Sequence, residues 1–144
     1  KTDKNALAVM IMADTMQQMI RKRILLVEYE PLLVSLYKEA FLEEPFVLDV
    51  AETGSNALEQ VSKNRPDLIL LDILLPGMNG FEVLRKLKAS SKTRDIPVIV
   101  LTNLGSEETD KDRQLALSLG AVDYLVKSYH TPDEMIKIVS KRLN

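Results

Sequence analysis

Apolar residues occur in short runs along most of the chain, and windows of helical length separate these runs. From Arg23 onward the runs cover residues 24–27, 46–50, 67–71, 97–101 and 121–126. Each has the length of a strand, and the central ones lack the alternation expected of a strand with one face in water. Strands that alternate with amphipathic helices are typical of a parallel sheet covered on both faces. The pattern therefore predicts a doubly wound α/β domain.

Residues that begin or end helices stand between the runs. Those expected to open the first three helices and to close the fourth are Pro31, Gly54, Gly80 and Gly120. Residues 131–134, Thr-Pro-Asp-Glu, have the sequence of a capping box with proline at the first helical position, so a last helix is expected to begin there.

Residues 1–22 precede the repeat and show helical spacing. The apolar positions that recur on one face are Val9, Met12, Ala13, Met16, Met19 and Ile20. This amphipathic helix has three interpretations: it packs on its own domain, it is part of a linker, or it forms a Met-rich surface for a homodimer or another partner. We favour the third. The basic residues 21–23 gather at one end and line no polar face, which argues against a membrane-surface helix. We expect a division into 1–22 and a domain of 23–144.

Composition narrows the function classes. A chain of 144 residues with 46% hydrophobic residues is large enough for one core and too small for two. The net charge of -2 and the absence of a basic stripe argue against direct binding of nucleic acid. The chain has no cysteine and one histidine, which excludes disulfides, thiolate zinc sites and histidine-cluster metal sites. No apolar segment has the length of a membrane span and no signal peptide is recognisable, so a cytoplasmic location is expected.

Polar residues follow the predicted strands at the point where each one ends. Glu28 follows the first run, Asp72 the third, Thr102 the fourth and Lys127 the fifth. Because the carboxyl ends of parallel strands share one edge of the sheet, these side chains should converge there. Each alone has a plain structural explanation as a strand end or a solvated charge. Together they are the groups that transient phosphorylation of a carboxylate requires: a nucleophilic aspartate, an acidic Mg²⁺ ligand, a hydroxyl and a cation.

In these segments the chain resembles the receiver domain of two-component response regulators, over nearly all of residues 23–144. The matching segments are 24–28 with 30–31, 66–72 with 76–80, 100–102, and 119–127. The resemblance implies a flavodoxin-like (βα)5 fold with strand order 2-1-3-4-5, which agrees with the repeat. It also implies a phosphorylation switch in two-component or phosphorelay signalling.

The resemblance implies a role for each residue at the strand ends. Asp72 corresponds to the phosphoacceptor, which takes a phosphoryl group from a histidine kinase or a phosphotransfer protein. Glu28, Asp72 and the backbone carbonyl of Leu74 correspond to Mg²⁺ ligands. Any catalysis is then limited to self-catalysed phosphorylation and dephosphorylation of the aspartate. A flavin-binding relative of the same fold is disfavoured, because the acidic residues 28–30 would repel a phosphate.

Three residues correspond to the parts that hold and report the phosphoryl group. Thr102 and Lys127 match the hydroxyl and the basic residue that contact its oxygens. Thr102 and Tyr124 also correspond to the switch residues of the family, although Tyr124 could equally be a half-buried strand aromatic. The expected output surface is the fourth helix, fifth strand and fifth helix of the repeat, where a downstream protein partner would bind.

Tyr29 is the main departure from the family pattern. The family normally has a second acid at this position, and a neutral phenol is a poor replacement for a hard, charged oxygen ligand. Weakened Mg²⁺ binding is therefore expected. Glu30 offers a carboxylate next door, but alternation along a strand directs it away from the site. Two functions stay open: a phosphoaccepting receiver, which we favour, and a pseudo-receiver that serves as an interaction or dimerisation module.

Overall fold

A computed structural model of the protein describes residues 3–103 and 107–144, with the side chains of 17–20 and 107–109 left out. The described residues form a five-stranded parallel sheet with the order β2-β1-β3-β4-β5. Its strands are β1 (Lys22–Val27), β2 (Phe46–Ala51), β3 (Leu68–Asp72), β4 (Val98–Thr102) and β5 (Asp123–Val126). The predicted doubly wound fold and its 2-1-3-4-5 order are confirmed.

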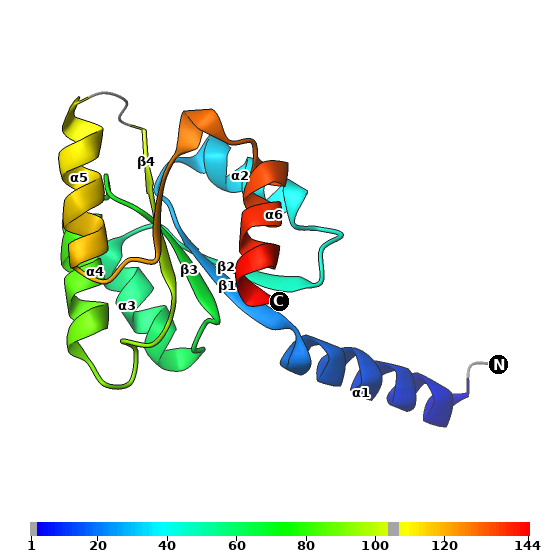
Figure 1. The fold of residues 1–144 in the computed structure, drawn as a ribbon. Coiled ribbons are helices and arrows are strands. Elements are labelled where there is room, and N and C mark those ends of the chain that lie inside the picture. Colours follow the sequence, from blue (N-terminus) through cyan, green and yellow to red (C-terminus); the bar gives the residue numbers. More distant parts are fainter. Residues whose placement is uncertain (1–2, 104–106) are drawn as a thin grey trace.

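Helices cover both faces of this sheet (Figure 1). One face carries α3 (Gly54–Lys63), α4 (Gly80–Ala89) and α5 (Glu107–Ser118), and the other carries α2 (Pro31–Ala40) and α6 (Pro132–Leu143). A short 3-10 helix, η1 (Lys127–Tyr129), follows β5. Because an additional helix, α1 (Lys4–Ile20), precedes the sheet, the fourth and fifth helices of the predicted repeat are α5 and α6.

The hydrophobic core has two halves, one on each face of the sheet. Alternate residues of the central strands point into each half. Leu25, Ile69 and Val100 pack with α3, α4 and α5, whereas Ile24, Leu70 and Leu101 pack with α2 and α6. All residues of β3 and β4 are buried. Burial on both faces explains why the sequence of these strands is continuously apolar.

The predicted helix boundaries are also confirmed. The Thr131 side chain accepts a hydrogen bond from the backbone N–H of Glu134, and the Glu134 carboxylate accepts one from the backbone N–H of Thr131, which completes the capping box. Gly120 follows α5 with a φ of 109°, a conformation that glycine adopts at little cost. The first strand begins at Lys22, earlier than the apolar run, because Lys22 pairs with Phe46 of β2.

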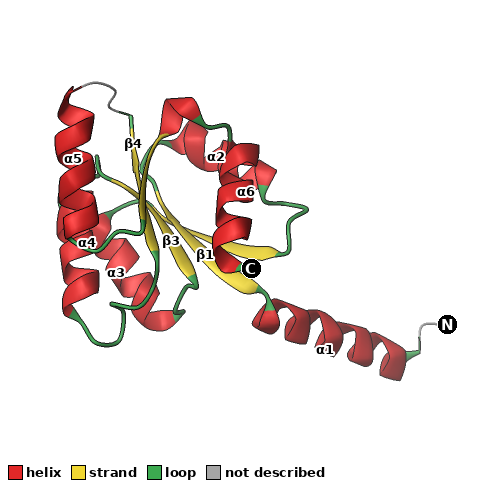
Figure 2. Cartoon of the chain, in the orientation of Figure 1, coloured by secondary structure: helices red, strands yellow, loops and turns green. Residues whose placement is uncertain are grey.

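The helix α1 extends away from the sheet and its covering helices (Figures 1 and 2). Every described side chain of α1 is exposed, so the helix does not pack on its own domain. The large apolar side chains among them are Leu7, Val9, Met10, Ile11, Met12 and Met16. At about 100° per residue, Leu7 and Ile11 lie on the side opposite Val9 and Met16. The helix is therefore apolar on two sides, which is a broader surface than the predicted stripe, and the side chains of Met19 and Ile20 lie outside the described residues.

None of the helices in the described ranges combines the length and the apolar character that crossing a lipid bilayer requires.

Candidate functional site

The carboxyl ends of the strands bring together the four residues that the sequence places there. Glu28 follows β1, Asp72 ends β3, Thr102 ends β4 and Lys127 follows β5. Asp72 lies opposite Leu101, and Thr102 lies opposite Val126, so the ends of β3, β4 and β5 are level with one another. Across the described part of the chain, these four are the polar or charged residues that are buried. Burial of polar groups at one edge requires that they satisfy one another.

Lys127 bridges the two carboxylates. Its Nζ lies 2.9 Å from Oδ2 of Asp72 and also contacts Oε1 of Glu28. The three side chains are 2–6% exposed, so the ion pairs are largely shielded from water. One ammonium therefore balances two carboxylates, which leaves the site with a net negative charge when both acids are ionised.

Backbone N–H groups complete the environment of each carboxylate. The N–H of Leu74 donates to Oδ1 of Asp72 at 3.2 Å, and the N–H of Glu30 donates to Oε2 of Glu28 at 3.1 Å. Each carboxylate thus accepts one hydrogen bond from the turn that follows its own strand, and shares Lys127 with the other. These contacts hold both carboxylates at fixed positions on the sheet edge.

Burial raises the pKa of the Asp72 carboxyl from 3.8 to about 6. The Lys127 ammonium opposes this rise, whereas the neighbouring Glu28 carboxylate adds to it. The shift follows from the sharing of one cation by two acids in a buried place. Asp72 is therefore largely ionised at neutral pH and becomes protonated as the pH falls through about 6.

Tyr124 of β5 is fully buried, with its ring directed into the core half beneath α5. Burial raises the pKa of the Tyr124 phenol, and the Thr102 side chain opposes the rise. The Thr102 side chain therefore lies near the phenol oxygen of Tyr124. The guanidinium carbon of Arg113 in α5 lies 5.3 Å from the centre of the Tyr124 ring. This contact joins α5 to β5, and no spacing in the sequence indicates it.

Gly80 is closer to the site than its sequence position suggests. A Cβ atom at this position would lie 2.3 Å from the carbonyl oxygen of Asp72 and 2.7 Å from Cα of Ile73. The backbone N–H of Gly80 also donates to the carbonyl of Ile73 at 2.8 Å. The start of α4 is thus packed directly on the backbone of Asp72. The sequence marks Gly80 only as the start of a helix, because the approach comes from tertiary packing.

Tyr29 lies outside the cluster of buried groups. Its side chain is 55% exposed, and that of Glu30 is exposed as well. Within residues 3–103 and 107–144, no three side chains of His, Cys, Asp or Glu gather in the way a metal centre requires. The oxygen donors at this edge are the carboxylates of Glu28 and Asp72 and the backbone carbonyl of Leu74, and hard oxygens of this kind suit Mg²⁺.

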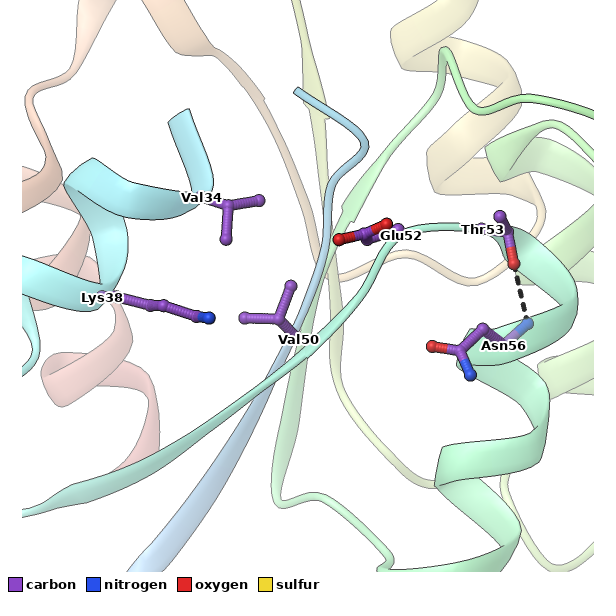
Figure 3. A pocket seen from close by; sticks show the side chains of 6 residues that line it. All are labelled: Val34, Lys38, Val50, Glu52, Thr53 and Asn56. Carbon is purple, nitrogen blue, oxygen red and sulfur yellow. Dashed lines mark hydrogen bonds between the residues drawn. The ribbon is translucent and has the colours of Figure 1, made fainter. Parts of the chain in front are cut away.

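Four hollows on the described surface have linings that contain none of the four buried residues of the site. One lies between α2 and α3 beside the end of β2, as Figure 3 shows. Its lining residues are Val34, Lys38, Val50, Glu52, Thr53 and Asn56. None of the residues predicted for the phosphorylation site lines it.

Comparison with known proteins agrees with this geometry. The response regulator receiver domain matches residues 24–140. The DNA-binding response regulator MtrA of Mycolicibacterium smegmatis is 41% identical over 125 residues, covering 86% of this chain and 51% of MtrA. The chain spans about half the length of the curated relatives it matches.

Two solved structures show the same fold in informative states. The Mn²⁺-bound form of response regulator Rcp1 has a TM-score of 0.73 and 31% identity, covering 85% of this chain and 95% of Rcp1. The phosphorylated cyanobacterial phytochrome response regulator RcpA has a TM-score of 0.72 and 29% identity, covering 85% of this chain and 91% of RcpA. The match over residues 24–140 shows that this chain belongs to the family of response regulator receiver domains.

Proposed function

We propose that Asp72 accepts the phosphoryl group in this receiver domain. Receiver domains are the phosphorylation switches of two-component systems, and they receive their signal from histidine kinases. The observation that carries the assignment to Asp72 is the burial of its carboxylate beside Glu28 and Lys127 at the carboxyl edge of the sheet. An ionised carboxylate held in place there is suited to attack phosphorus in a phosphohistidine or a small acyl phosphate, with departure of the donor group.

Lys127 and Thr102 act on the phosphoryl group once it is attached. Phosphorylation of Asp72 replaces a single negative charge by a group carrying about -1.5 to -2 charges. The Lys127 ammonium already lies 2.9 Å from Asp72, so it is placed to pair with a phosphoryl oxygen. The Thr102 hydroxyl ends the neighbouring strand, and a hydrogen bond to another phosphoryl oxygen would draw it away from Tyr124.

The movement of the Thr102 side chain toward the phosphoryl group would couple phosphorylation to the position of Tyr124. Tyr124 is buried against α5, and Arg113 of that helix lies over its ring. A change in the Thr102 position alters the space beside the Tyr124 ring, and the surface of α5, β5 and α6 responds. We infer that this surface binds the downstream protein partner, and that a histidine kinase or a phosphotransfer protein docks at the Asp72 edge.

Mg²⁺ is the cofactor that the donor set fits. The carboxylates of Glu28 and Asp72 and the carbonyl of Leu74 would hold it, and when bound it would neutralise charge on the phosphoryl oxygens. Tyr29 supplies a phenol where the family normally has an acid. Because the phenol is uncharged at neutral pH, we infer weaker Mg²⁺ binding than in receivers that carry the acid.

A second function is favoured by Tyr29 and by α1. In this alternative the chain is an interaction module whose phosphorylation is impaired and whose output is association. We also propose a division into an N-terminal segment (residues 1–22) that contains α1 and a receiver domain (residues 23–144), which serves both functions. We propose that α1 mediates homodimerisation, because its exposed apolar side chains would be removed from water in a dimer.

Intact mass spectrometry separates the two functions. The unmodified chain, Asp72→Asn and Tyr29→Asp would each be incubated with acetyl phosphate and Mg²⁺, with circular dichroism to verify folding. The proposal expects a phosphate adduct on the unmodified chain and none on Asp72→Asn. An adduct on Tyr29→Asp alone would favour the interaction module, and an adduct on Asp72→Asn would overturn the assignment of the acceptor.

A further inference from the structure

The domain carries its own exposed apolar surface, on α2 and β2. Leu42, which follows α2, is 78% exposed. Leu42 borders a hollow whose other lining residues are Lys38, Phe41, Phe46 and Leu48. The hollow of Figure 3 also contains Lys38 and continues along β2 to Val50 and Thr53. We call these two hollows together the β2 groove.

The floor of the β2 groove is the open edge of the sheet. β2 is the outermost strand beside β1. The carbonyl of Ala51 accepts a hydrogen bond from the N–H of Glu28, so the backbone of Ala51 faces inward, and alternation turns the backbone of Phe46, Leu48 and Val50 outward. The Gln60 side chain donates to the carbonyl of Val50 at 2.8 Å and so protects that end. Proteins commonly cover such an edge with a helix or a loop.

We propose that α1 of a second copy packs in the β2 groove, in a reciprocal twofold exchange. This inference rests on the proposed homodimer and specifies its interface. The groove runs beside six residues of β2, or about 20 Å, and the apolar part of α1 from Leu7 to Met16 spans about 15 Å. Flexible methionine side chains also suit an irregular apolar surface.

Packing of α1 in the β2 groove would cover two exposed apolar surfaces, one on the helix and one on the domain. Because Leu7 and Ile11 lie opposite Val9 and Met16, a pair of α1 helices joined by one side would leave the other apolar side in water. Such a pair would also leave Leu42 and the β2 groove exposed. When α1 packs in the β2 groove, one contact covers an apolar side of α1 and the groove together. Twofold symmetry repeats this contact in the other copy.

The helix that occupies the groove comes from the other copy. Arg21 alone separates the last residue of α1 from the first residue of β1, and α1 extends away from its own domain (Figure 1). So short a connection leaves little chain for α1 to turn back along β2 of its own domain. A second copy brings the same helix to the groove without that constraint.

The charges around the groove agree with this occupant. A further hollow shares Leu42 with the groove and is lined by Glu39, Glu43 and Glu44. Exposed basic residues flank the apolar part of α1: Lys4 is its first residue, and Arg21 and Lys22 follow its last. Opposite signs on the two surfaces favour their association.

Disulfide trapping tests the interface directly, because the chain has no cysteine of its own. Met12→Cys and Leu42→Cys variants of the full chain would be mixed under mild oxidation, and the products would be identified by intact mass and peptide mapping. Met12 and Leu42 are both exposed in the single chain, at 63% and 78%. The expected product is the mixed Met12→Cys/Leu42→Cys dimer. Leu115→Cys is the matched control, because Leu115 is an exposed leucine on α5, on the opposite face of the sheet.

The outcomes distinguish this interface from the proposals on which it rests. Sedimentation equilibrium should show a dimer, and Leu42→Asp should raise its dissociation constant by about tenfold or more. If the only disulfide-linked product joins two Met12→Cys chains, the groove interface is overturned and a dimer through contact between two α1 helices is retained. A chain that stays monomeric at millimolar concentration would overturn both. The Asp72 assignment depends on neither result, since phosphorylation of the monomer is measured separately.

Discussion

The Nζ atom of Lys127 lies 2.9 Å from Oδ2 of Asp72, and the same atom contacts the Glu28 carboxylate. The two acids therefore depend on a single cation. Any change that adds charge at Asp72, removes the cation or adds a second one will redistribute these contacts. The stability and the ligand binding of the domain are thus coupled at this edge.

Removal of the shared cation should destabilise the domain. In Lys127→Met both carboxylates stay buried without their ion pair, and we expect unfolding to require about 2–4 kcal/mol less at pH 7. Urea denaturation followed by circular dichroism measures this. Lys63→Met is the control, because Lys63 pairs with Glu59 on the surface and its loss should cost about 0.5 kcal/mol or less. Equal losses in the two variants would contradict a special role for Lys127.

The raised pKa of Asp72 makes stability depend on pH in metal-free buffer. Between pH 3.8 and about 6 the folded chain holds a proton on Asp72 that the unfolded chain has lost, so the free energy of unfolding falls as pH rises through this window. Asp72→Asn removes this contribution. At pH 7.5 it should be roughly 1–3 kcal/mol more stable than the parent chain, with the difference vanishing near pH 4. A constant difference from pH 4 to 8 would show that Asp72 does not titrate in this way.

Gly80→Ala should disturb the site through the backbone. The added Cβ would meet the Asp72 carbonyl oxygen at 2.3 Å, and relief of this clash requires α4 or the end of β3 to move. We expect a loss of about 2–4 kcal/mol in stability and slower phosphorylation. Gly77→Ala is the comparison, because its Cβ would meet no described atom within 4 Å and only its φ of 75° is unfavourable, at about 1 kcal/mol. A larger loss at Gly77 would contradict the packing of α4 on Asp72.

Tyr29→Asp should strengthen Mg²⁺ binding by about tenfold or more, because it adds a charged oxygen beside Glu28. Titration calorimetry of the unmodified chain, Tyr29→Asp and Tyr29→Phe measures this. Tyr29→Phe removes only the hydroxyl, so its affinity should equal that of the unmodified chain. A marked loss of affinity in Tyr29→Phe would mean that the phenol oxygen itself binds the metal.

The fold and the convergence of Glu28, Asp72, Thr102 and Lys127 could be predicted because both follow from periodicity. Strands buried on both faces are continuously apolar, and residues at the ends of parallel strands share an edge whatever the details of packing. Caps such as Thr131 with Glu134 are local, so they too are visible in the sequence. The roles of the site residues in phosphorylation remain predictions from the family pattern.

Contacts between distant segments could not be predicted. The sharing of Lys127 by two acids, the approach of Gly80 to the Asp72 carbonyl and the position of Arg113 over Tyr124 all depend on side-chain packing between elements. The surface that covers α1 could not be predicted for the same reason. Helical spacing identifies the apolar sides of α1, but it does not say which surface covers them.

The strand that carries Asp72 lies between β1 and β4 and is buried along its whole length. Its amide protons should therefore exchange with solvent deuterium only when the whole domain unfolds, more slowly than those of the edge strands β2 and β5. The proposed acceptor is thus attached to a central strand that we expect to stay in place when the surrounding segments move. Displacements that report phosphorylation must then arise in the segments around Asp72, and a comparison of deuterium uptake with and without acetyl phosphate should find them there.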